Sequence, residues 1–395
     1  METNSAQSWL PEFQTFRGVA TLEIIVFHGV VGGVAALGLL SSLAGGILAL
    51  VAGSSFGGVS QFIFISGVVL FNRYRHDFPL TRFYKRRVNA VLWPYIIFST
   101  FYFVYPLVAG RVAHATLSSS YAGMAGWNYT RGYLLGLATG TTALHLWFVL
   151  LILQLYALYP LIIWAYHRIA RRRNVTVAVL LILLGIQTAY SILFPHVHAL
   201  FVSGIFYFVL GIVVCDHYAA IKNKITKAPL VPILTIIVLC SVGYADIIYQ
   251  VYWMPGASSV YVWLDYLKEP LYAMLLIAFY LKISLILAEP RGAVTRSIAK
   301  VGEDSFGIYL VHFFFVTTLS ALFIHFGVGY TSVIYYPSLI IATLLTSYAA
   351  AHVLYRLPFS NVIIGRPRKQ VLTTPPQGTP NVPSSSADEY AMSTD

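Results

Sequence analysis

The chain alternates long apolar stretches with short polar ones, and this pattern predicts a bundle of membrane-spanning helices. A helix needs about 20 mostly apolar residues to cross a bilayer core of about 30 Å, and about ten stretches meet that requirement. The expected spans cover residues 16–40, 55–72, 88–109, 145–167, 174–194, 198–217, 229–250, 267–288, 305–326 and 332–355. The expected fold class is therefore all-α, a polytopic integral membrane protein. The segment SSLAGGILALVAGSSFGGVS, at the second span, is rich in small residues. It predicts either an extension of the first hairpin or a break.

Basic residues between the apolar stretches predict which side of the membrane each loop faces. Cytoplasmic loops carry an excess of Lys and Arg. Most of the 25 Lys and Arg residues fall in residues 73–87, 168–173, 222–227, 291–300 and 356–369. These segments occur at every second loop, as expected for an even number of spans with both termini in the cytoplasm.

Two segments fall outside this alternation. Residues 110–144 form the longest outer loop, and their Trp, Tyr and Leu content predicts an interfacial or re-entrant helix. The last residues, 370–395, are rich in Pro, Ser and Thr and predict a disordered cytoplasmic tail. The predicted organisation is thus a membrane-embedded domain over residues 1–369 followed by this tail.

Composition supports a membrane protein and argues against several soluble classes. Only 10% of the residues are charged and 58% are hydrophobic, whereas soluble proteins have about 25% charged residues. The net charge of +11 reflects the basic loops, so we expect no nucleic-acid partner. Cys215 and Cys240 lie in apolar runs without a C-x-x-C pair, which makes them packing residues. We expect no metal site.

The first span contains three ionisable residues, Arg17, Glu23 and His28, within FRGVATLEIIVFHG. Arg17 and His28 are eleven residues apart, close to three helical turns, so both project from one face about 16 Å apart. Alone, Arg17 fits a snorkelling residue at the inner interface and His28 fits a hydrogen-bonded core histidine. Together they favour a functional site, because ionisable groups inside a membrane usually face the bundle interior or a cavity. Glu23 points elsewhere and needs another partner, or is protonated.

Other polar residues are candidate site residues, and for each of them a purely structural role is an equally good explanation. His145 and Trp147 begin a span near the outer interface, where Trp147 fits either a site or an interface anchor. Tyr309 and His312 share a helix face and fit either a buried hydrogen-bonded pair or a site. The basic run RFYKRR indicates a cytoplasmic loop and can also bind anions. Its basic residues are Arg82, Lys85, Arg86 and Arg87. The motifs G-x-x-x-x-G-K-[ST], H-E-x-x-H and G-x-S-x-G do not occur.

Four segments resemble, in their order along the chain, signatures of the acyltransferase type 3 family of integral membrane proteins. They are FRGVATLEIIVFHG, GGVSQFIFISGVVL, HLWFVLLILQLYALYPLI and SFGIYLVH. The resemblance covers residues 13–369 and includes the tail YRLPFSNVIIGRPRK. It implies that the protein O-acylates a hydroxyl group of a surface or lipid-linked saccharide, with cytoplasmic acyl-CoA as co-substrate and no bound cofactor. It also implies a multi-pass protein of the cell membrane, in contact with membrane lipids.

The resemblance also implies roles for individual residues. His28 would be the catalytic histidine and Arg17 its essential companion, while basic residues after the second span would bind the phosphates of CoA. The family often shows an Arg-x-x-Arg pattern there, whereas KRRVNAVLWPY has adjacent Arg86 and Arg87. The assignment of either arginine to the donor is therefore open.

The expected mechanism combines these residues with general acid–base chemistry. His28 removes a proton from the acceptor hydroxyl, because a positioned base typically contributes about 10²–10⁴-fold. Arg17 and the Arg82–Arg87 run hold the donor, and Trp147, Tyr309 and His312 line the cavity.

Three alternatives remain open at the level of sequence. A transporter or flippase shares the span count and the buried charges, but it usually shows paired halves with broken helices. The sequence has no internal symmetry of that kind. A membrane-bound sensor is expected to carry a soluble signalling domain. A covalent acyl-enzyme is a further possibility, with no Ser or Cys tied to His28.

Overall fold

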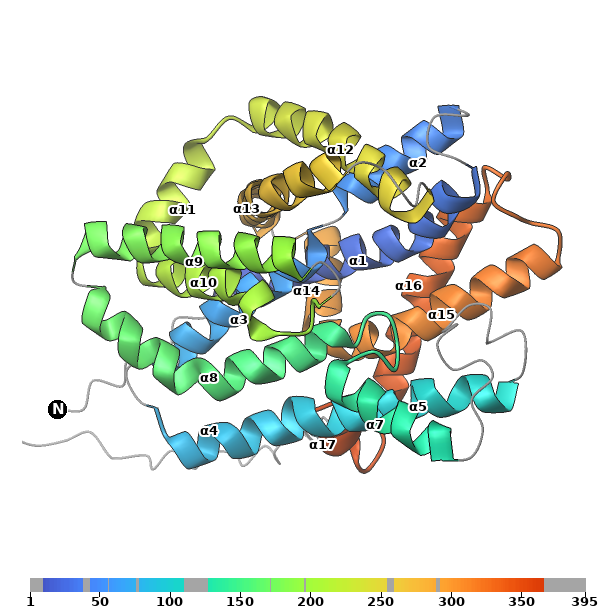
Figure 1. The fold of residues 1–395 in the computed structure, drawn as a ribbon, viewed down its shortest axis with the longest axis horizontal. Coiled ribbons are helices and arrows are strands. Elements are labelled where there is room, and N and C mark those ends of the chain that lie inside the picture. The colour runs from blue at the N-terminus through green and yellow to red at the C-terminus, as the bar shows by residue number, and fades with distance from the viewer. Residues whose placement is uncertain are drawn as a thin grey trace, which may run out of the picture.

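The computed structural model confirms an all-α protein. It describes residues 10–37, 43–55, 57–75, 78–109, 127–170, 172–194, 197–253, 259–288 and 292–365, and every regular element within these ranges is helical (Figure 1). The helices are α1 (Pro11–Leu37), α2 (Leu43–Ser54), α3 (Gly58–Tyr74), α4 (Leu80–Arg87), the π-helical turn η1 (Val88–Leu92), α5 (Trp93–Ala109), α7 (Trp127–Thr139), α8 (Trp147–Ile169), α9 (Arg173–Leu193), the 3-10 turn η3 (Phe201–Ser203), α10 (Ile205–Asp216), α11 (Tyr218–Lys227), α12 (Leu230–Trp253), α13 (Ser259–Ala288), α14 (Ala293–Glu303), α15 (Ser305–His325), α16 (Tyr335–Leu354) and α17 (Ser360–Ile363).

The described helices include eight candidate membrane spans, or nine if the bent pair α10–α11 is counted. The expectation of about ten spans with both termini in the cytoplasm therefore stays a prediction. The span expected over 229–250 falls on α12, whose side chains are described only as far as Ser241. The helix expected in the long outer loop is present as α7, and the expected tail at 370–395 lies outside the described residues.

The span expected over residues 198–217 falls on η3 and α10. Only α10 is α-helical there, and its 12 residues reach about 18 Å, short of a bilayer core. The chain then bends by 96° into α11. Helix α11 carries Lys222, Lys224 and Lys227, and α10 and α11 together are long and apolar enough to count as one bent span.

Helix α1 lies at the centre of the bundle, packed against α3, α13, α14, α15 and α16. Its approach to α14 is the closest. A Cβ atom added to Gly18 would lie 2.0 Å from the carbonyl oxygen of Ile298, and one added to Gly302 would lie 2.0 Å from that of Gln14. Only glycine allows two backbones to come this near, so these glycines fix α14 across the first turns of α1.

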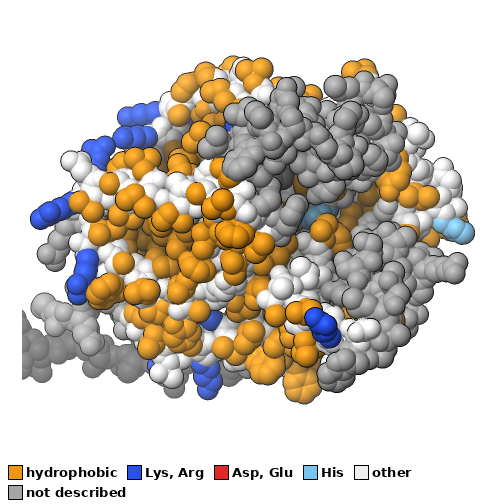
Figure 2. All heavy atoms as spheres, viewed as in Figure 1, with side chains coloured by type: hydrophobic (Ala, Val, Ile, Leu, Met, Phe, Trp, Pro, Cys, Tyr) orange, Lys and Arg blue, Asp and Glu red, His pale blue; other side chains and the backbone are white. Residues whose placement is uncertain are grey.

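The outer surface fits a lipid environment. Helix α9 exposes large apolar side chains, among them Leu181 at 62%. Figure 2 shows apolar side chains covering the face formed by α8, α9 and α10, with most of the visible Lys and Arg toward the end where α11 and the α8–α9 turn lie. This end is the inner side predicted from the basic loops.

The second predicted span contains a break, and Glu23 explains how it is stabilised. Helix α2 ends at Ser54 and α3 begins at Gly58, and the first amides of a helix lack partners within it. Glu23 is only 4% exposed, and its Oε2 accepts a 2.5 Å hydrogen bond from Gln61 Nε2. The Gly57 backbone also hydrogen-bonds this carboxyl group. Glu23 therefore ties α1 to the start of α3, where a helix N-terminus favours an acceptor.

Replacing Glu23 by Ala is expected to lower the thermal unfolding midpoint in detergent. The Gln61 amide would lose its acceptor inside the bundle, and an unsatisfied buried polar group costs about 1–3 kcal/mol. Glu23→Gln is the matched control, because it keeps an acceptor oxygen and the side-chain volume and should shift the midpoint less. Equal midpoints for the wild type and Glu23→Ala would contradict this role.

Candidate active site

Three histidines from separate parts of the chain meet inside the bundle. His28 lies on α1, His145 precedes α8, and His312 lies in the second turn of α15. The ring centroids of His28 and His312 are 5.2 Å apart, as are those of His145 and His312. Phe313 packs against the rings of His28 and His145, with centroids 5.5 and 5.2 Å away. We call His28, His145 and His312 the histidine cluster.

The hydrogen bond of His312 defines how its ring is protonated. Its Nδ1 lies 2.6 Å from the carbonyl oxygen of Tyr309. A carbonyl only accepts, so Nδ1 carries the proton and Nε2 of the neutral ring is an acceptor. Within the described residues this Nε2 has no hydrogen-bond partner. His312 therefore presents a free acceptor atom inside the histidine cluster.

The three histidines differ in how accessible they are. His145 is 3% exposed and His312 is fully buried, whereas His28 is only partly buried. His28 is thus the member that a substrate can reach most directly. His145, which the sequence predicts near the outer interface, is buried and belongs to the cluster.

Two tyrosines hold α15 in place beside the cluster. The Tyr309 hydroxyl donates to the carbonyl oxygen of His145, and the Tyr102 hydroxyl donates to that of Leu310 at 2.8 Å. The Phe314 amide in turn donates to the Tyr102 oxygen at 3.2 Å. The rings of Tyr102 and Tyr309 lie 5.0 and 5.3 Å from that of His145. These bonds fix the backbone that carries His312 and His145.

A cavity of about 240 Å³ adjoins the cluster at Tyr309. It is lined by Arg17, Phe62, Ile65, Ser66, Arg87, Ala90, Val91, Phe148, Val149, Ile152, Tyr156, Glu303, Ser305, Phe306, Tyr309, Tyr355, Ile364 and Gly365. We call it the arginine cavity. Its lining includes Tyr309, whose ring lies 5.5 Å from that of His312. The cavity is thus lined by Arg17, Arg87 and Tyr309, and Tyr309 contacts His312, which in turn contacts His28.

Arg87 is the member of the basic run that enters the arginine cavity. Its guanidinium carbon lies 5.5 Å from the ring centroid of Phe83 and 5.1 Å from that of Tyr156, which is cation–π distance. The π-helical turn η1 follows it directly, and such turns often occur at functional sites. The remaining basic residues of the run are exposed on α4 and do not line the cavity. They are Arg82, Lys85 and Arg86.

Trp147 is a further predicted site residue that lies apart from the arginine cavity and the histidine cluster. It is partly buried, and its ring packs 5.6 Å from that of His198. It neither lines the arginine cavity nor joins the histidine cluster. Among the described residues, no group of three or more His, Cys, Asp or Glu side chains is arranged to hold a metal ion, the histidine cluster included.

Several residues of the site carried no signal in the sequence. Tyr102 sits in the run FYFVY, where it looks like any aromatic residue of an apolar span. Tyr156 and Tyr355 enter the lining of the arginine cavity from α8 and from the end of α16. Their positions depend on how distant helices pack, which hydrophobic periodicity does not encode.

Comparison with known proteins gives one match. Residues 10–352 match a family described as an acyltransferase domain, and this stretch includes every residue of the histidine cluster. No curated protein and no solved structure matches the chain.

Proposed function

The chain belongs to the acyltransferase type 3 family, and from this premise we propose that it moves an acyl group from cytoplasmic acyl-CoA to a saccharide hydroxyl. The family and the apolar helices make it a membrane acyltransferase, which acts on an acyl donor and an acceptor. The observation that carries the finer proposal is the contact of His28 with His312 directly behind the arginine cavity.

The arginine cavity is the proposed donor site. Arg17 and Arg87 line it, at the end that the basic loops predict to be the inner one, and guanidinium groups match phosphate oxygens through paired hydrogen bonds. CoA carries its phosphates at one end and the acyl thioester at the end of a flexible arm. With the phosphates at Arg17, the arm would run along α1 past Tyr309 toward His28, which lies about 16 Å further along the axis.

His28 is the proposed general base. A thioester is a good acyl donor, but a sugar hydroxyl is a poor nucleophile near neutral pH. His28 takes the hydroxyl proton as the oxygen attacks the thioester carbonyl carbon. The carbon–sulfur bond then breaks, and the departing CoA sulfur takes that proton from the imidazolium. The products are the acyl ester and free CoA, and His28 returns to its neutral form.

His312 and Tyr309 are proposed to position His28 and the donor. The free Nε2 of His312 is a suitable acceptor for one N–H of His28, which would leave the other His28 nitrogen facing the hydroxyl. Tyr309 lines the cavity and also touches His312, so it stands where the donor would pass. The acceptor would approach from the opposite side, as a surface or lipid-linked saccharide of the cell membrane.

The test is acyl transfer by the purified protein in vesicles. We expect release of free CoA thiol from acyl-CoA in the presence of an acceptor glycan. Mass spectrometry of surface glycans from cells with and without the protein should show one ester that depends on it. Movement of a saccharide across the vesicle membrane, with no thiol release and no missing ester, would instead support the transporter reading.

A further inference from the structure

One wall of the arginine cavity comes from the last residues that the structure describes. After α16 the chain passes through Tyr355 and the short helix α17, and Tyr355, Ile364 and Gly365 all line the cavity. These residues follow the stretch 10–352 that matches the acyltransferase family. Ile364 is 1% exposed, so this part of the chain is packed into the bundle. We call residues 355–365 the C-terminal wall.

The C-terminal wall is held at both of its ends by a close approach. At its start, a Cβ atom added to Gly307 of α15 would lie 2.9 Å from the Tyr355 hydroxyl oxygen. At its end, a Cβ atom added to Gly365 would overlap the carbonyl group of Ala90 in η1, with the carbonyl carbon 2.7 Å away. Gly365 also has φ +71°, in the left-handed region that favours glycine. Glycine at this position therefore permits both the turn and the contact with η1.

The π-helical turn η1 determines which way Arg87 points. Arg87 is the last residue of α4, and η1 joins α4 to α5. Hydrogen bonds in a π-helical turn run from residue i to residue i+5, one residue further than in an α-helix. The Trp93 amide accordingly donates to the Val88 carbonyl. If η1 relaxed into an α-helix, α4 would rotate against α5 by about 100°, the angle of one residue, and Arg87 would leave the cavity.

Arg87 also has an unused hydrogen-bond donor beside this wall. Its Nε is buried and has no hydrogen-bond partner within the described residues. A buried donor without a partner is costly, and on a guanidinium group it favours an anion as the missing acceptor. The arginine cavity therefore contains a cation that is prepared for a ligand.

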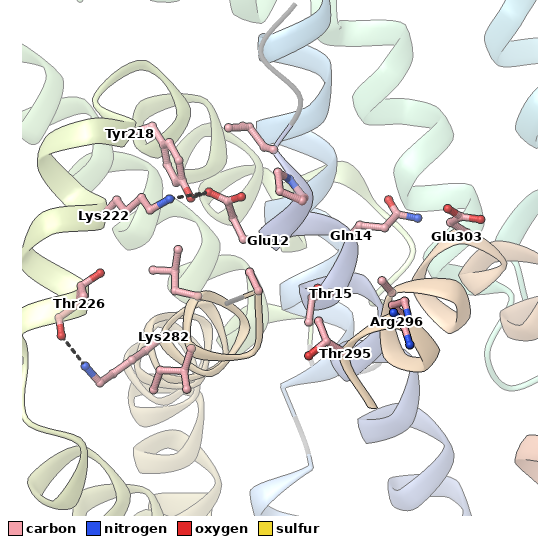
Figure 3. Close-up of a pocket in the computed structure, with 16 residues that line it drawn as sticks. Glu12, Gln14, Thr15, Tyr218, Lys222, Thr226, Lys282, Thr295, Arg296 and Glu303 are labelled. Atoms are coloured by element: carbon pink, nitrogen blue, oxygen red, sulfur yellow. Dashed lines mark hydrogen bonds and ion pairs between the residues drawn. The ribbon is translucent and has the colours of Figure 1, made fainter. Parts of the chain in front are cut away.

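A larger cavity, of about 730 Å³, offers no comparable group (Figure 3). It is lined by residues of α1, α11, α13 and α14. Glu12 and Lys282, its buried charged residues, already have partners in the protein. The Glu12 carboxylate lies 3.3 Å from Lys222 Nζ, and Lys282 Nζ donates to the last carbonyl groups of α11, including that of Thr226 at 2.9 Å. The search for a further determinant of ligand binding thus leads back to the arginine cavity and its C-terminal wall.

We propose that the contact of Gly365 with Ala90 holds η1 in its π-helical form and thereby keeps Arg87 at the donor phosphates. This inference rests on the proposed donor site. Gly365 is then a positioning residue, which acts through η1 and Arg87. Its loss should weaken donor binding and leave kcat nearly unchanged, because His28, the proposed base, lies on α1 and does not line the arginine cavity.

The experiment compares the wild type with Gly365→Ala, Gly365→Asn and Gly327→Ala in nanodiscs. Gly327→Ala is the matched control, because Gly327 has φ +80° but an added Cβ atom would meet nothing within 4 Å. It introduces the strain of a left-handed alanine without a new contact. Gly365→Asn makes the opposite separation, because Asn adopts the left-handed region more readily than Ala but still places a Cβ atom against Ala90. The unfolding midpoint of each variant checks that it is folded.

Both variants of Gly365 are expected to bind CoA about tenfold more weakly than the wild type, the effect of losing one charge-assisted contact. Isothermal titration calorimetry with CoA measures this affinity without any acyl transfer. The KM for acyl-CoA should rise by the same factor, while kcat stays near the wild-type value. Gly327→Ala should match the wild type in all three quantities.

Hydrogen–deuterium exchange tests the link to η1 without any ligand. The amides of residues 88–92 should exchange faster in both Gly365 variants than in Gly327→Ala. Unchanged exchange there would overturn the inference, as would a wild type that binds no CoA or equal CoA affinities of Gly365→Asn and Gly327→Ala.

The same measurements separate this inference from the proposed reaction. A wild type that binds CoA in the expected pattern but transfers no acyl group would refute the reaction and leave the role of Gly365 standing. Acyl transfer by the wild type, with the KM for acyl-CoA unchanged in both Gly365 variants, would support the reaction and refute that role.

Discussion

Replacing His28 by Ala is expected to reduce acyl transfer by about 10²–10⁴-fold, the usual contribution of a positioned general base. The loss should appear in kcat at saturating acyl-CoA, because the arginine cavity, where the donor is proposed to bind, does not include His28. The measurement is the rate of CoA thiol release by the purified variant in vesicles.

Two other histidine variants make this result specific. His325→Ala changes an exposed histidine at the far end of α15 and should leave the rate unchanged. His312→Ala should lower the rate less than His28→Ala, because it removes the group that orients the base. The double variant His28→Ala/His312→Ala should then be no slower than His28→Ala alone. A folded His28→Ala protein that keeps the wild-type rate would refute His28 as the base.

The sequence predicted the helical class and much of the first span of this protein. The lengths of the apolar stretches and the basic loops between them were enough to predict an all-α membrane protein. In lipid each span must make its backbone hydrogen bonds within itself, as a helix does. The eleven-residue spacing of Arg17 and His28 predicted one shared face, and in the structure Arg17 lines the cavity that adjoins the cluster of His28.

Other features depended on contacts between distant segments. The partner of Glu23 is Gln61, 38 residues away on α3, and its side chain reaches Glu23 only through the packing of α1 against α3. Small residues allowed either a break or a continuous hairpin there. His145 lies in the connection between α7 and α8. Hydrophobic periodicity does not predict the course of such a connection.

The choice between Arg86 and Arg87 illustrates a limit of local patterns. Adjacent residues on a helix point about 100° apart, and in the structure Arg87 is partly buried while Arg86 is exposed. The sequence did not indicate which of the two arginines lines the cavity. The π-helical turn η1, which follows Arg87, also changes the helical phase of the residues after it. In the structure Arg87 packs against Phe83 and Tyr156 and lines the arginine cavity, whereas Arg86 does not line it.

Replacing Arg87 by Ala is therefore expected to raise KM for acyl-CoA about tenfold or more, the effect of losing a charge-assisted hydrogen bond to phosphate. Arg86→Ala is the matched control. It removes the same charge from the neighbouring position, but Arg86 is exposed and lies outside the arginine cavity. It should change KM little at physiological salt, where exposed charges are screened.

The comparison is made by measuring thiol release over a range of acyl-CoA concentrations. Arg87 also packs between two aromatic rings, so its loss can lower stability. Arg87→Lys separates the two effects, because it keeps a positive charge but loses the planar fork. It should recover the unfolding midpoint more than it recovers KM. An Arg86→Ala variant with the larger rise in KM would place the donor phosphates on the outer face of α4, and the arginine cavity would then not be the donor site.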